Sequence, residues 1–230
     1  MNAKTSTSDQ FQRSVTSFLL MTGFHSFILG WRFGIGFTAL LALHEAGHAL
    51  ALWRITGQIR FPTFIPFIGA IIFIAPDDVR TYRQELVFAA MGPVFGLSGC
   101  LLVILAQVLF FTTNTTLLGI AFWGGLMNLI NLVPRAPFDG GRMLRALGPA
   151  MQILGLCLLV FTAVYFKNIL FLAIGVLCAF KPDMVIYPDP PKVRDYVACT
   201  VSYLALVSSL VGVVLFTLYR TSVQGSIPAQ

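Results

Sequence analysis

Long apolar runs separated by short polar segments dominate the pattern of hydrophobic and polar positions along the chain. A run of about 20 apolar residues is long enough to cross the hydrocarbon core of a bilayer as a helix. This pattern predicts an all-α polytopic membrane protein with six to seven transmembrane helices. The predicted spans are about 15–31, 33–54, 85–111, 117–133, 150–166, 168–180 and 196–219. The count falls to six if 150–180 forms one long helix.

One apolar stretch does not fit a spanning helix. Residues 59–76 are rich in Phe and Ile, but Pro62, Pro66 and Gly69 interrupt the run. Two β-prone arms around a glycine predict a small β-hairpin that is inserted into the membrane. Such backbone is tolerated at membrane depth only where protein covers it or where it lines a wet cavity. An amphipathic surface loop is the alternative interpretation.

The two ends of the chain are polar. We expect residues 1–14 to form a disordered cytosolic tail and residues 221–230 to form a second, short tail. Between them, 15–220 is predicted to form a single transmembrane domain, because no stretch is long enough for a separate soluble domain. The apolar run 17–30 is followed by no cleavage site of the A-x-A type, so it is interpreted as a retained span.

Composition and charge agree with a membrane protein. Hydrophobic residues make up 57% of the chain and charged residues 10%, whereas globular proteins average about 25% charged residues. The net charge of +6 does not indicate nucleic-acid binding, because the basic residues are spread over short loops. With the N-terminus inside, only Arg32, Lys167 and Arg220 lie on the outer side, which favours seven crossings. We expect a multi-pass protein of the bacterial cell membrane.

The candidate chemistry begins in the second predicted span, at His44-Glu45-Ala46-Gly47-His48. Residues i and i+4 share one face of a helix, so His44 and His48 can bind the same metal ion. Glu45 is turned by about 100° from His44, which suits holding a water molecule better than binding the metal. In zinc hydrolases, the metal lowers the pKa of such a water and the glutamate accepts its proton. The alternative is a chance match, but ionisable groups inside an apolar span are costly and usually functional.

A hydrolytic zinc needs a third protein ligand and an open position for water. Asp139 is the best candidate, because it follows the fourth predicted span on the same side of the membrane as the histidine pair. Gly140 and Gly141 allow a tight turn there. An Asp-Gly pair by itself is also common in ordinary turns, so the prediction depends on the two motifs together.

Further residues of small or polar character surround these motifs. Asn128 and Asn131 lie three apart on one helical face, so both amides can reach the same cavity, where they suit an oxyanion or a substrate carbonyl. For Asn128 we favour interhelical hydrogen bonding. A stripe of glycines in the third predicted span favours close helix packing: Gly92, Gly96 and Gly99.

These motifs resemble those of the site-2 protease family of intramembrane zinc metalloproteases. The matching elements are HEAGH at 44–48, MGPVFG at 91–96 and NLVPRAPFDGG at 131–141, and FIPFIGAIIF at 64–73 resembles the family's membrane-inserted hairpin. The resemblance covers about 34–145, which we expect to be the core of the domain. It implies Zn²⁺ bound by His44, His48 and Asp139, with Glu45 as general base and Asn131 as partner of the substrate or oxyanion.

The reaction implied is hydrolysis of peptide bonds in or next to transmembrane segments of membrane-protein substrates, with the active site toward the cytoplasm. The lipid bilayer and such substrates are the expected partners, and the oligomeric state is left open. A catalytically inactive relative that binds membrane segments without cutting them is the alternative. A transporter or channel that uses the histidines as a metal pathway is disfavoured, because apart from Glu45 and Glu85 the apolar runs carry no acidic residue. A glutamate could also supply the third metal ligand. Apart from Glu45 the sequence has only Glu85, which lies beside a loop, so Asp139 is the better candidate.

Overall fold

The computed structural model describes residues 7–66, 69–75, 77–111, 113–165, 167, 176, 178–179 and 187–225, without the side chains of 224 and 225. In these ranges the chain is mostly helical, with one two-stranded sheet. The helices are α1 (Thr7–Leu29), α2 (Trp31–Thr56), α3 (Tyr82–Phe110), α4 (Thr115–Asn131), α5 (Asp139–Met143), the 3₁₀ helix η1 (Arg145–Leu147), α6 (Pro149–Tyr165) and α8 (Val193–Gly225). The strands are β1 (Thr63–Ile65) and β2 (Gly69–Ile71).

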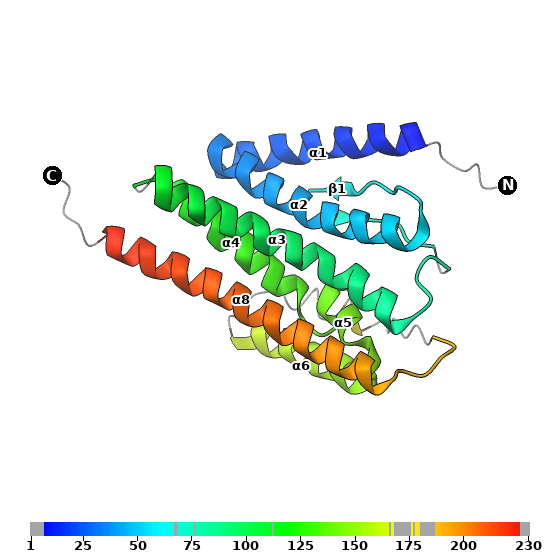
Figure 1. Cartoon of the computed structure of the whole chain (residues 1–230). Coiled ribbons are helices and arrows are strands. Elements are labelled where there is room, and N and C mark those ends of the chain that lie inside the picture. Colours follow the sequence, from blue (N-terminus) through cyan, green and yellow to red (C-terminus); the bar gives the residue numbers. More distant parts are fainter. Residues whose placement is uncertain are drawn as a thin grey trace.

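The long helices lie side by side in a layered bundle (Figure 1). α1 packs on α2, α2 packs on α3, and α4 contacts both α3 and α8. α2 ends at the same end of the bundle at which α3 and α8 begin, and α4 leads toward α5 near that end (Figure 1). This arrangement brings the second half of α2 close to the segment that follows α4.

Local signals in the sequence explain where several helices begin and end. Gly57 ends α2 in the left-handed conformation, with φ of 73°, which glycine adopts at little cost. The Thr81 side chain accepts a hydrogen bond from the Gln84 N–H at the start of α3. Asn114 caps α4 in the same way, through the N–H of Leu117. Each cap satisfies a backbone group that the helix itself leaves unpaired.

Three helices in the described ranges are long and apolar enough to cross a membrane: α2, α3 and α8. α6 is also apolar but has only 17 residues, and α1 and α4 correspond to two further predicted spans. The predicted helical class is therefore confirmed, and α2, α3 and α8 are candidate membrane spans. The count of six to seven crossings stays a prediction. The predicted span 168–180 lies outside the described residues, apart from Val176, Cys178 and Ala179.

Two boundaries differ from the sequence-based expectation. α1 begins at Thr7, so residues 7–14, assigned above to a disordered tail, are helical. α8 continues to Gly225, past the predicted end of the domain at 220. Polarity marks where a segment leaves the hydrocarbon layer, but helical backbone hydrogen bonds continue equally well in water. Asp9 in the first turn of α1 also favours a helix start there.

The predicted hairpin is present as the antiparallel pair β1–β2, with Phe64 opposite Ala70. Gly69 has φ of 116°, a conformation that residues with a side chain rarely adopt. The main-chain N–H of Phe64 donates to the Ser17 hydroxyl of α1 at 3.1 Å. The Phe64 side chain packs in a cluster with Leu41 of α2. The hairpin is thus held against α1 and α2, about one turn before His44.

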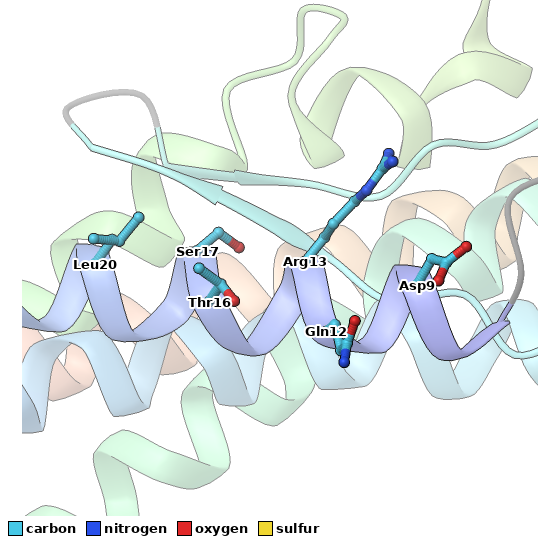
Figure 2. Close-up of a pocket in the computed structure, with 6 residues that line it drawn as sticks. All are labelled: Asp9, Gln12, Arg13, Thr16, Ser17 and Leu20. Carbon is cyan, nitrogen blue, oxygen red and sulfur yellow. The ribbon is translucent and has the colours of Figure 1, made fainter.

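A surface pocket of about 500 Å³ lies along α1 beside the hairpin, whose strands pass close to it in Figure 2. One side of α1 lines it, through Asp9, Gln12, Arg13, Thr16, Ser17 and Leu20. All six residues belong to α1, so this pocket is separate from the histidine and aspartate motifs.

Candidate metal centre

His44, His48 and Asp139 lie together in the structure, and all three are buried. The Nε2 atoms of the two histidines are 3.1 Å apart. Oδ2 of Asp139 is 3.2 Å from each of them. α2 supplies both imidazoles from one face, and Asp139 is the first residue of α5. Three donor atoms from two distant segments therefore form a nearly equilateral triangle.

This triangle fits a single zinc ion. Ligands about 2.05 Å from zinc in tetrahedral geometry are about 3.3 Å from one another, close to the separations of 3.1 and 3.2 Å here. His44, His48 and Asp139 would supply three protein ligands, which leaves the fourth position of a zinc ion for water, as a hydrolytic site requires.

Hydrogen bonds fix the orientation of both imidazoles. The Asn128 Nδ2 group donates to the Gly124 carbonyl at 2.8 Å, so its Oδ1 accepts from the Nδ1–H of His44, also at 2.8 Å. His48 Nδ1 lies 2.8 Å from the Phe88 carbonyl, which can only accept. Each ring therefore carries its proton on Nδ1 and directs the Nε2 lone pair at the centre. Neutral imidazole Nε2 atoms beside a carboxylate are the donor set that zinc prefers.

Asn128 has a larger role than the packing contact expected from the sequence. It does form an interhelical hydrogen bond, but its partner is a predicted metal ligand, and it is fully buried. Its position three residues before Asn131, on the same helical face, was the signal available in the sequence. Asn131 is the last residue of α4 and is partly buried. The catalytic role predicted for Asn131 stays a prediction.

Two acidic residues, Asp139 and Glu45, are buried at or beside the centre and have different proposed roles. The Asp139 carboxylate lies 3.2 Å from the Nε2 atoms of both His44 and His48, a position from which it can bind the same cation. Glu45 is also buried and interacts electrostatically with both histidines and Asp139. It adjoins the centre without belonging to the triangle, as expected for a general base.

Glycines of α2 and α3 allow the two helices to pack closely around the side chains of the centre. A Cβ at Gly92 would collide with the His48 ring, and a Cβ at Gly96 would collide with the Asn128 amide. A Cβ at Gly47 would meet the Met91 carbonyl. The glycine stripe predicted to serve helix packing therefore packs α3 directly against the metal-site residues.

The loop that leads to Asp139 is held from several sides. Gln152 of α6 accepts from the Ala136 N–H at 2.8 Å and donates to the Gly141 carbonyl at 2.9 Å. The Tyr203 hydroxyl of α8 donates to the Leu132 carbonyl at 2.8 Å. The sequence offered no signal for Gln152 or Tyr203, because both lie in apolar helices outside any motif.

The sequence is also similar to those of known proteins. No family model matches the chain. Over 132 residues the chain is 30% identical to Rip3, named as a candidate zinc metalloprotease, in the Erdman and H37Rv strains of Mycobacterium tuberculosis. The match covers 52% of this chain and 32% of that protein, so the chain spans about a third of its relative's length. This match supports the resemblance to zinc metalloproteases that the two motifs indicate.

A solved member of the site-2 protease family also aligns with the chain. It is the site-2 protease from Methanocaldococcus jannaschii, at 18% sequence identity and a TM-score of 0.45. The alignment covers 78% of this chain and 92% of that one. The resemblance to the site-2 protease family depends on the sequence match and on the two motifs that meet in the structure.

Proposed function

We propose that this protein is an intramembrane zinc metalloendopeptidase that hydrolyses peptide bonds in or next to transmembrane segments of membrane-protein substrates. The main support is the meeting of two imidazole Nε2 atoms and one carboxylate oxygen within 3.2 Å of one another in a buried position. Three acceptor atoms that face one another are costly to bury unless a cation lies between them. Metal binding accounts for this arrangement.

His44, His48 and Asp139 are proposed to hold the ion. A zinc ion bound there would acidify a water molecule and polarise the carbonyl of the peptide bond to be cut. Glu45 takes a proton from the water while the water oxygen bonds to the carbonyl carbon. It delivers that proton to the amine nitrogen as the C–N bond breaks. Asn128 keeps the His44 ring in the orientation that binds metal, and Asn131 is proposed to donate to the carbonyl oxygen.

The β1–β2 hairpin is proposed to hold the substrate. The carbonyl groups of a helical substrate are engaged in its own hydrogen bonds, so the helix must unwind near the cleaved bond. An extended segment can pair with an exposed strand edge by β-augmentation. The Phe64 N–H of β1 already bonds to Ser17, which leaves β2 as the better edge. Unchanged cleavage after deletion of the turn at Gly69 would exclude this role.

The centre is proposed to face the cytoplasm in a multi-pass protein of the bacterial cell membrane. The proposal follows from the distribution of basic residues over the predicted loops. Water must then reach the ion from the cytoplasmic end of α2.

The proposed function can be tested by measuring the zinc content of the purified protein together with its cleavage of a model transmembrane peptide. We expect purified protein to hold about one zinc ion per chain and to cut a model transmembrane peptide. Asp139→Ala should lose the zinc, whereas Glu45→Gln should keep it and lose about 10²–10⁴-fold in rate. If the wild-type protein holds zinc but cuts no membrane peptide, the inactive, segment-binding alternative is supported instead.

A further inference from the structure

Glu85 lies in the first turn of α3 and is almost fully buried, with 1% of its surface exposed. Its carboxylate accepts from Nε and Nη2 of Arg142 at 2.7 and 3.3 Å, and from the Tyr187 hydroxyl at 2.6 Å. The Arg145 guanidinium lies 3.5 Å away. The sequence suggested only a boundary residue beside a loop. In the structure, Glu85 is the centre of a buried polar cluster that joins α3, α5, η1 and the segment before α8.

This cluster reaches both halves of the metal centre. On α5, Arg142 lies three residues after Asp139, on the same short helix. The Arg142 guanidinium also lies over the Phe88 ring, 4.4 Å from its centroid. Phe88 stacks on the His48 ring at 5.0 Å, and its carbonyl accepts the His48 Nδ1–H. Arg142 therefore connects to one ligand through the backbone of α5 and to another through Phe88.

α5 cannot hold Asp139 in place by itself. It has five residues, whereas isolated helices shorter than about 12–15 residues are marginal in water. The position of the Asp139 carboxylate must therefore be set by contacts that α5 makes with its neighbours. The bidentate Glu85–Arg142 pair is such a contact, and its planar fork geometry fixes orientation as well as distance.

We propose that Glu85 and Arg142 are positioning residues of the metal centre. Their ion pair fixes α5 on α3 so that the Asp139 carboxylate meets the Nε2 atoms of His44 and His48. This inference depends on the proposed function, in that the three side chains must bind a metal. General stabilisation explains the pair less well, because the desolvation of a buried ion pair offsets much of its Coulombic attraction.

Metal binding by the full chain in detergent tests the proposal. Glu85→Gln keeps the shape of the side chain and removes the charge that pairs with Arg142. We expect zinc affinity to fall about 10- to 100-fold, as is typical when the groups that orient metal ligands are changed. The d–d absorption spectrum of the cobalt-substituted protein should also change, because it reports ligand geometry.

Two further variants separate positioning from simple effects of charge or stability. In the double variant Glu85→Gln/Arg142→Gln the net charge of the cluster equals that of the wild type, so a purely electrostatic effect predicts recovery of zinc affinity. Positioning predicts that affinity stays low and the cobalt spectrum stays altered. The matched control is Asp78→Asn, which breaks an ion pair with Arg60 at the base of the hairpin, 2.8 Å long. It should leave zinc affinity and the cobalt spectrum unchanged.

The outcomes distinguish this inference from the proposed function. If wild-type protein binds one zinc ion and both Glu85 variants match it in affinity and spectrum, positioning by Glu85 is wrong and the protease proposal stands. If wild-type protein binds no zinc, the proposed function fails first and this inference falls with it. Should Glu85→Gln not fold, Arg142→Lys decides: it keeps the charge and loses the bidentate fork. Wild-type affinity in that variant would overturn the proposal.

Discussion

Replacing Asn128 should weaken metal binding through the orientation of one imidazole. The Asn128 Oδ1 accepts the Nδ1–H of His44 at 2.8 Å, and the side chain is fully buried. In Asn128→Ala, the Nδ1–H of His44 has no acceptor while the Nε2 atom of the same ring faces the metal. A buried donor left unpaired costs about 1–3 kcal/mol. The apoprotein avoids this cost by rotating the ring or moving its proton, so the cost falls mainly on the metal-bound state.

At about 1.4 kcal/mol per tenfold change in affinity, this cost corresponds to a zinc affinity about 5- to 150-fold weaker than in the wild type. Competition with a chromophoric chelator in detergent measures the affinity directly. Asn128→Asp should retain most of the affinity, because a carboxylate oxygen accepts the same hydrogen bond. Full zinc affinity in Asn128→Ala would refute the argument that this amide orients His44.

A matched control comes from the other end of the same helix. Asn114 caps α4 by accepting from the Leu117 N–H at 3.3 Å. Asn114→Ala removes a side-chain amide from α4 as Asn128→Ala does, and loss of such a cap costs about 1 kcal/mol of stability. We expect lower thermal stability and unchanged zinc affinity. Equal losses of affinity in both variants would show that the effect follows from weakening α4 and not from the His44 contact.

Three further predictions concern the surroundings of the centre. Gly92→Ala should abolish zinc binding, because a Cβ there collides with the His48 ring, whereas Gly212→Ala, where nothing lies within 4 Å, should leave zinc content unchanged. Gln152→Leu should lower zinc affinity by loosening the loop before Asp139, and a chelator competition measures the change. Zinc at about 100 times its Kd should add about 2.7 kcal/mol to the stability of the wild type and nothing to that of Asp139→Ala. Thermal unfolding with and without chelator checks this difference.

The proximity of the three proposed metal ligands could be predicted from the sequence because each motif carries its own geometry. The i, i+4 spacing of His44 and His48 puts both rings on one helical face whatever surrounds the helix. Asp139 was identifiable because Gly140 and Gly141 mark a turn after a helix that ends on the same predicted side. The hairpin was identifiable because Pro and Gly interrupt an apolar run of β-prone residues.

The helix ends and the groups around the ligands could not be predicted in the same way. Hydropathy reports contact with lipid and not helix length, so α1 and α8 extend beyond their predicted limits. Glu85, Gln152 and Tyr203 contact the loop and helix around Asp139 from three other helices. Such contacts depend on how the helices pack together, and no local pattern encodes them.

The two halves of the centre differ in how much outside support they need. His44 and His48 belong to a helix of 26 residues whose own hydrogen bonds fix their spacing. Asp139 begins a helix of five residues after an irregular loop, so its position depends on contacts from elsewhere. Those contacts come from α3 through Glu85, from α6 through Gln152 and from α8 through Tyr203. The position of Asp139 in the proposed metal site therefore depends on how α3, α6 and α8 pack around it, whereas the spacing of the two histidines does not.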